Sequence, residues 1–69
     1  MDSARLCHMA NQIARNFAAQ GNEAAIKATA RHIQEFWDPR MKAALVSVEG
    51  AGLDPIALEA IQALRHELA

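Results

Sequence analysis

Two Asp-Pro pairs, at residues 38–39 and 54–55, constrain the fold most strongly because each predicts where a helix begins. The carboxylate of Asp accepts hydrogen bonds from the free N–H groups of a first helical turn, and Pro at the first helical position loses nothing because its missing N–H would have no partner there. Gly21-Asn22 predicts a third boundary, because Gly adopts the left-handed conformation that ends many helices and Asn can cap the next one. The chain should therefore divide into four helices.

The predicted helices leave little of the chain outside them, and no strand pattern competes with them. Their expected ranges are about Ser3 to Gln20, Glu23 to Phe36, Pro39 to Glu49 and Pro55 to Glu67. The first carries an amphipathic stripe within roughly 100° of arc, formed by Leu6, Met9, Ala10, Ile13 and Phe17. The second carries two neighbouring stripes, Ile26/Ala30/Ile33/Trp37 and Ala25/Ala28/His32/Phe36, so we expect it to pack on two sides.

These patterns predict an all-α fold, a small bundle of three to four short helices, in a single helical domain over residues 1–69. The short connection at Gly21 predicts that the first two helices form a tight antiparallel pair. The third helix, with only about eleven residues, could cross that pair instead of extending a regular bundle.

The core of such a domain is thin. The chain has 69 residues, of which sixteen are Ala, while Leu, Ile, Val, Phe and Trp together also number sixteen. A chain of this length buries only about 60% of the surface that its unfolded form exposes, and each Ala buries far less apolar area than a Leu or Phe. We therefore expect the helices to approach closely and the chain to gain stability from the surface of a partner.

Charge and composition exclude several classes of function. The formal net charge is −1 with interspersed signs, which predicts neither a nucleic-acid partner nor an anionic membrane surface. No stretch approaches the roughly 18 apolar residues that span a bilayer. The single cysteine, Cys7, excludes an intramolecular disulfide, and Asp2, Arg5 and Arg15 interrupt what a secretion signal would need as an apolar stretch. The sequence is typical of a cytoplasmic protein.

Candidate catalytic and metal-ligating residues are few. The possible metal ligands, Cys7, His8, His32 and His66, lack convergent spacing, because adjacent residues of a helix diverge by about 100°. Nucleophiles are limited to two Ser and one Thr, with no Gly-rich loop to form an oxyanion hole. The carboxylates are interpreted as surface groups on solvent-exposed faces of the helices. We therefore expect no catalytic, cofactor-binding or metal-binding residue in this chain.

A helix-turn-helix DNA reader is a further alternative, because the second and third predicted helices meet at a short corner followed by Arg40 and Lys42. Recognition helices normally present several cations to phosphate, whereas here two cations lie near one end of a helix in a negatively charged chain. This alternative ranks last.

The corner from Phe36 to Met41 contains two of the three aromatic residues. In one interpretation Phe36, Trp37 and Met41 simply fill the internal core. In the other, the rigid Asp38-Pro39 turn presents Trp37 and Arg40 to a partner, since Trp and Arg are enriched at interface hot spots. Val46 is another apolar residue off the predicted inner stripe, with no obvious internal contact.

Three segments resemble a known family in order and spacing. They are Met9 to Phe17, His32 to Met41 with its Phe-Trp-Asp-Pro-Arg-Met string, and Gly52-Leu53-Asp54-Pro55. With them the chain resembles the delta subunit of NAD-dependent, molybdenum-containing formate dehydrogenases over nearly its whole length. The resemblance implies no role for Cys7 or His66, which lie outside these segments.

The resemblance implies a cytoplasmic complex that oxidises formate to carbon dioxide and reduces NAD. Its other subunits carry the molybdenum bis-guanine-dinucleotide cofactor, the iron–sulfur clusters, FMN and the NAD site. The chain itself would be a non-catalytic accessory subunit that docks on the alpha subunit and stabilises the complex. The alternative is a transient chaperone for insertion of the molybdenum cofactor into the alpha subunit. The residues expected to meet the partner are Phe36, Trp37, Asp38, Pro39, Arg40, Met41, Met9 and Phe17.

Overall fold

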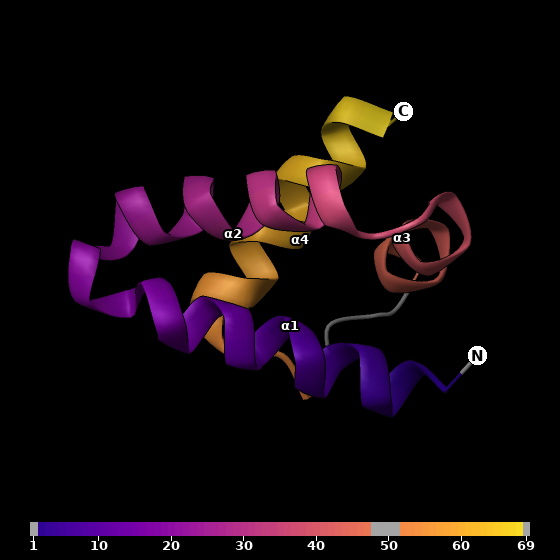
Figure 1. Ribbon diagram of the computed structural model, residues 1–69, viewed down its shortest axis with the longest axis horizontal. Coiled ribbons are helices and arrows are strands. Elements are labelled where there is room, and N and C mark those ends of the chain that lie inside the picture. Colours follow the sequence, from indigo (N-terminus) through magenta and orange to yellow (C-terminus); the bar gives the residue numbers. More distant parts are fainter. Residues whose placement is uncertain (1, 48–51, 69) are drawn as a thin grey trace.

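The computed structural model describes residues 2–47 and 52–68, the side chains of 67 and 68 excepted, and this part of the chain consists of helices and their connections. Helix α1 spans Ser3–Phe17 and continues into a short 3-10 turn, Ala18–Gln20; α2 spans Asn22–Phe36, α3 Pro39–Val46 and α4 Pro55–Leu68 (Figure 1). The predictions of an all-α fold and of four helices are confirmed.

Both Asp-Pro pairs begin a helix, as predicted. Oδ1 of Asp38 accepts a hydrogen bond from the N–H of Met41 at 2.8 Å, and Pro39 is the first residue of α3. Pro55 is likewise the first residue of α4, whose first turn is closed by the Asp54 carbonyl, which accepts from the N–H of Leu58 at 2.8 Å. The predicted carboxylate cap is therefore confirmed for Asp38, whereas the carboxylate of Asp54 pairs with Arg15 and does not cap α4.

The turn between α1 and α2 differs from the prediction in its capping residue. Gly21 has a φ of +97°, which a side chain would strain, so the expected role of glycine is confirmed. Gly21 also occupies the cap position of α2, and no side-chain hydrogen bond caps this helix. The prediction that Asn22 caps α2 is therefore wrong. The 3-10 turn after Phe17 tightens the end of α1, and α2 begins one residue earlier than expected, at Asn22 itself.

Helix α3 is shorter than predicted. It ends at Val46, and Ser47 forms a turn in which its hydroxyl donates to the carbonyl of Ala44 at 2.9 Å. Such a side-chain bond competes with the helical hydrogen-bond pattern and favours a helix end. The rest of the predicted third helix, Val48 and Glu49, and the expected stop at Gly50-Ala51 lie outside the described residues.

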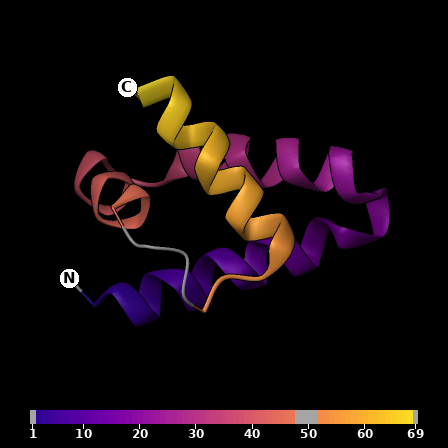
Figure 2. The ribbon, with the colours of Figure 1, turned by 180° about the vertical axis from the view of Figure 1, so that it is seen from behind.

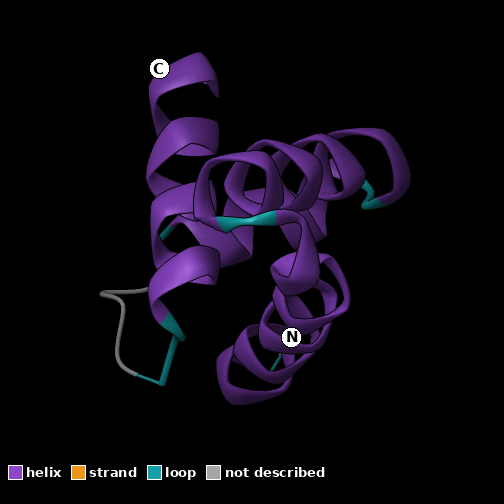
Figure 3. Cartoon of the chain, turned by 90° about the vertical axis from the view of Figure 1, so that its left-hand side faces the viewer, coloured by secondary structure: helices purple, strands orange, loops and turns teal. Residues whose placement is uncertain are grey.

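The helices are arranged as a crossed pair with an end cap. Helices α1 and α2 run antiparallel, as predicted, and α4 crosses behind them, packing most extensively on α2 (Figures 1 and 2). Helix α3 packs on α1 and α4 at the end where α1 begins and α2 ends. Seen along the α1–α2 pair, α4 stands on one side only (Figure 3). The arrangement is thus a crossed bundle: α4 crosses the pair, and α3, seen nearly end-on in Figure 1, also runs across the direction of α1 and α2 instead of extending a regular bundle.

The core lies between α4 and the α1–α2 pair and uses small residues where helices meet. Ala10, Ala14, Ala25, Ala57 and Ala60 are all buried, which lets the helix backbones approach closely, as the composition predicted. The larger core side chains are Leu6, Ile33, Trp37, Leu45, Ile61 and Leu64.

The inner face of α2 differs from the two predicted stripes. Its buried residues are Ala25, Thr29 and Ile33, with Trp37 directly after the helix. The burial of Thr29 was not predicted, because a polar residue interrupts the apolar pattern. The hydroxyl of Thr29 is fully buried without a hydrogen-bond partner. Val46, for which the sequence suggested no internal contact, packs partly buried against the core. In the described part of the chain no helix has both the length and the apolar character needed to span a bilayer.

Candidate functional site

The Phe36 to Met41 corner separates its two aromatic residues. Trp37 is only 7% exposed and belongs to the core, whereas Phe36 is 72% exposed and is the one large apolar side chain left exposed among the described residues. Phe36 is the last residue of α2, and Trp37 has an extended backbone that turns the chain inward toward α3. The core interpretation is therefore confirmed for Trp37 and wrong for Phe36, and the exposure of Trp37 expected in the other interpretation is wrong.

The other residues of the corner divide between structure and surface. Asp38 is exposed, but its carboxylate caps α3, so it has a role in folding. Pro39 and Arg40 are exposed, and Met41 is partly buried against the core. What the corner offers to a partner is thus mainly Phe36 and Arg40.

The structure brings Phe36 together with Phe17 through His32, which the sequence placed on the same stripe as Phe36 and also considered as a metal ligand. The rings of His32 and Phe36 lie 4.8 Å apart at an interplanar angle of 40°, and those of Phe17 and His32 lie 6.4 Å apart, edge to face at 61°. Both geometries fall in the range of favourable aromatic contacts. We call Phe17, His32 and Phe36 the aromatic face.

The aromatic face crosses from α1 to α2. The spacing of four residues on one helix, which placed His32 and Phe36 on one predicted stripe, brings their rings together. The contact of His32 with Phe17 was not predicted, because it depends on how α1 and α2 pack on each other. Met9, the other expected contact on α1, lies two turns before Phe17 and is partly buried against the core, as is Ile13 between them. Of the predicted residues, Phe17 and Phe36 therefore lie on one face through His32, with Phe36 as its most exposed member.

A second structural unit links the Met9 to Phe17 and Gly52 to Pro55 segments. Asn11 is 8% exposed and its side chain holds the segment before α4: Nδ2 donates to the carbonyl of Gly52 at 2.7 Å, and Oδ1 accepts from the N–H of Asp54 at 2.8 Å. The Arg15 guanidinium pairs with the Asp54 carboxylate at 3.3 Å. We call this set the Asn11 clamp; it was not predicted, because its partners are far apart in the sequence.

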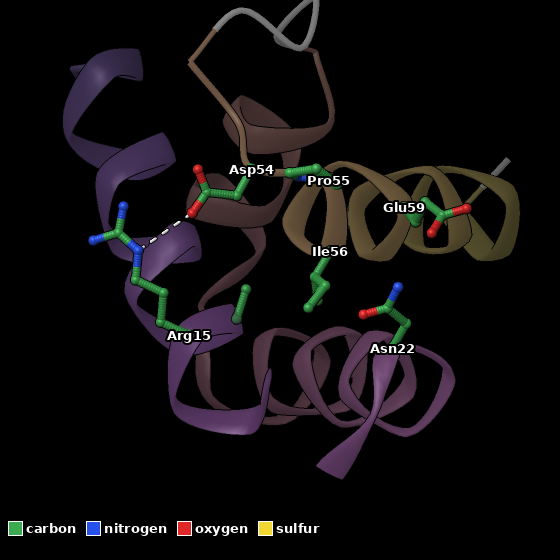
Figure 4. Close-up of a pocket in the computed structure, with 7 residues that line it drawn as sticks. Arg15, Asn22, Asp54, Pro55, Ile56 and Glu59 are labelled. Carbon is green, nitrogen blue, oxygen red and sulfur yellow. Dashed lines mark ion pairs between the residues drawn. The ribbon is translucent and has the colours of Figure 1, made fainter. Parts of the chain in front are cut away.

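A small cleft lies beside the Asn11 clamp (Figure 4). Its volume is about 250 Å³, and it is lined by Ala14, Arg15, Asn22, Asp54, Pro55, Ile56 and Glu59. Arg15 and Asp54 point toward each other at its edge, and Asn22 lies on the opposite wall. Both charged groups are substantially exposed, at 68% and 40% of their side chains, so the pair is screened by water. The cleft holds no buried polar group that would orient a ligand.

The possible metal ligands do not converge. Cys7 is buried on α1 while the adjacent His8 is exposed, and His66 is exposed near the end of α4. Over residues 2–47 and the described part of 52–68, no three His, Cys, Asp or Glu side chains are placed to hold a metal ion.

Comparison with known families decides what kind of protein presents these features. The family model described as NADH-dependent formate dehydrogenase delta subunit FdsD matches residues 5–61, which include the aromatic face, the corner and the Asn11 clamp. The chain belongs to this delta subunit family. The comparisons with curated proteins and with solved structures return no match.

Membership of the delta subunit family gives the structural features a context. Its name places the chain with a formate dehydrogenase complex, as the resemblance in the sequence indicated. The matched region of this delta subunit ends at Ile61, so it contains both Asp-Pro helix starts, the Gly21 turn and the exposed Phe36.

Proposed function

We propose that this delta subunit is a non-catalytic accessory subunit that docks on the molybdenum-bearing alpha subunit of its formate dehydrogenase and stabilises the complex. The observation that carries the proposal is the exposure of Phe36: a large aromatic side chain is 72% exposed beside two further rings of the aromatic face. Formate oxidation, and the molybdenum, iron–sulfur, FMN and NAD sites, are assigned to the other subunits.

Energetics support docking through the aromatic face. Burying a Phe side chain fully is worth about 1.5–3 kcal/mol, and about 70% of that gain is still unrealised in the free chain, as the exposure of Phe36 indicates. Completing its burial against a partner would contribute about 1–2 kcal/mol, or roughly tenfold in affinity. His32 restrains the ring through its 4.8 Å contact, so little side-chain freedom is lost on binding.

The thin core supports the same conclusion. Five of the twelve buried apolar residues are Ala, so the chain realises little burial for its length. A surface supplied by a larger subunit adds burial that the chain cannot supply itself, and binding to the folded state alone raises apparent stability by mass action.

The first test is purification of the tagged full chain from its host at near-physiological salt, with the bound proteins identified by mass spectrometry. The proposal predicts stoichiometric recovery of the alpha and flavin-bearing subunits together with formate-dependent NAD reduction. Recovery of the alpha subunit alone and without its cofactor would instead identify a maturation chaperone, and recovery of neither would refute both.

The second test replaces Phe36 with Ser in the tagged chain. Because Phe36 is mostly exposed, the melting temperature should change little, while recovery of the complex should fall about tenfold, as expected from its unrealised burial. Gln34→Ser, at a neighbouring exposed position of α2, is the matched control and should leave recovery unchanged. Equal recovery with both variants would exclude Phe36 as a docking residue.

A further inference from the structure

Three cationic side chains near one end of the molecule have no carboxylate partner among the described residues. They are Arg5 on α1 and Arg40 and Lys42 on α3. Helices α1 and α3 pack on each other, and Figure 1 shows α3 beside the N-terminal end of α1. Arg5 and Arg40 are exposed, and Lys42 is partly exposed and donates to the carbonyl of Gln34 at 3.3 Å, in the last turn of α2.

The remaining Arg and Lys side chains have other contacts within the chain. Three of them form ion pairs within the chain: Arg15 with Asp54, Lys27 with Glu23 and Arg31 with Glu35, at 3.3, 4.0 and 3.0 Å. Arg65 donates from Nε to the carbonyl of Val46 at 2.9 Å. Arg5, Arg40 and Lys42, which form no ion pair with a described carboxylate, therefore lie where α1 begins and where α3 packs on it.

Of the described carboxylates at the same end, Glu35 pairs with Arg31 within α2, and Asp2 and Asp38 are directed at helix backbones. Asp2 accepts from the N–H of Ala4 at 3.0 Å at the start of α1, and Asp38 accepts from the N–H of Met41 at the start of α3. Each carboxylate thus compensates the positive end of a helix dipole. The side chains of Arg5, Arg40 and Lys42 supply the charge that a partner would meet.

Two of these cations lie close to Phe36 along the chain or through a contact. Lys42 donates to the carbonyl of Gln34, in the last turn of the helix that Phe36 ends, and Arg40 follows Phe36 by four residues around the Asp38 corner. Arg5 lies on α1, on which α3 packs. An exposed aromatic residue with cations beside it has the composition of an interface core with a charged rim. Its complement is an apolar pocket with acidic residues along one side.

We propose that the delta subunit docks Phe36 into an apolar pocket of a formate dehydrogenase subunit and that carboxylates beside this pocket face Arg5, Arg40 and Lys42. This inference rests on the proposed function and adds the chemistry of the partner surface. The cations steer and orient association, while Phe36 supplies the buried contact, because rim charges act mainly on the association rate and its salt dependence.

The test measures association of the full-length chain with purified complex that lacks it, by surface plasmon resonance. One variant combines Arg5→Gln, Arg40→Gln and Lys42→Gln. The matched control combines Arg15→Gln, Lys27→Gln and Arg31→Gln, which removes the same amount of charge from ion-paired positions. Rates are compared between about 0.01 M and about 0.1 M salt, where the screening length falls from about 30 Å to about 10 Å.

The inference predicts that the Arg5/Arg40/Lys42 variant associates about tenfold more slowly than the unmodified chain at the lower salt, and that its association rate loses most of its salt dependence. The association rate of the control should stay within about threefold of that of the unmodified chain. Equal effects of the two variants would overturn the inference and leave the proposed function intact. Failure of the unmodified chain to bind would overturn both. Self-association of the chain that Phe36→Ser abolishes would overturn it too, because the aromatic face would then meet a second copy.

Discussion

Replacing Asn11 with Ala tests how much of the fold depends on the Asn11 clamp. The substitution removes two hydrogen bonds, of 2.7 Å to the carbonyl of Gly52 and of 2.8 Å from the N–H of Asp54, and leaves both backbone groups without their partner. Asn11 is 8% exposed, so water reaches its site poorly. The segment before α4 would lose its attachment to α1.

The expected loss of stability depends on whether each of the two backbone groups can find a new hydrogen-bond partner. Gly52 is exposed, so water can replace its lost bond at a cost of about 1 kcal/mol, whereas the half-buried N–H of Asp54 should cost about 1–3 kcal/mol. Together these give about 2–4 kcal/mol. Domains of this length have a total stability of about 3–10 kcal/mol, at roughly 0.05–0.15 kcal/mol per residue. The variant should therefore be strongly destabilised or unfolded.

The assay compares thermal and urea unfolding of Asn11→Ala with those of Asn16→Ala, an exposed Asn on the same helix. Both substitutions replace Asn with Ala in the same helix and gain the same helix propensity, about 0.5 kcal/mol. The difference between their free energies of unfolding is therefore the contribution of the Asn11 clamp. Circular dichroism follows the helices, and the fluorescence of the single tryptophan, buried Trp37, follows the core. Coincidence of the two transitions supports a two-state analysis.

The expected difference in melting temperature is at least about 8 °C, at about 4–8 °C per kcal/mol for a domain of this size. If the two variants unfold within about 1 kcal/mol of each other, the clamp does not hold the fold together and the reasoning is refuted.

Three further substitutions test the energetics of other positions. Thr29→Val should raise stability by about 1 kcal/mol, since it removes a buried hydroxyl without a hydrogen-bond partner; an unchanged or lower urea midpoint would mean that the hydroxyl is satisfied in solution. Trp37→Ala should cost about 3–5 kcal/mol, because Trp37 is part of the core, and loss of helical circular dichroism at room temperature is the expected result; a cooperative transition near that of the unmodified chain would contradict its burial. Arg15→Ala should change the free energy of unfolding by less than about 1 kcal/mol, because its pair with Asp54 is exposed and screened; a loss comparable to that of Asn11→Ala would show that the ion pair, not the amide, carries the clamp.

The sequence predicted the helices well because their limits depend on neighbouring residues. Asp38-Pro39 and Asp54-Pro55 act within a single turn, and Gly21 supplies a positive φ by itself, so short-range chemistry sufficed to divide the chain. The end of α3 was misplaced because the Ser47 side-chain bond to Ala44 competes with the helix pattern, which periodicity alone does not register.

What the sequence could not determine are the contacts between helices. Asn11 lies 41 and 43 residues from its hydrogen-bond partners, so nothing near it in the chain indicated that it would be buried. The family resemblance noted in the sequence agrees with the family match, but it did not show which residues of the motif face inward.

The sequence by itself therefore determined the helical class, the helix starts and the region in which a docking surface should be sought. Only the tertiary structure decided that Trp37 fills the core while the adjacent Phe36 remains exposed and contacts His32. The physical reason is that helix capping acts over a few residues. The burial of a side chain depends instead on how α3 and α4 pack against the α1–α2 pair, and α4 covers one side of that pair only.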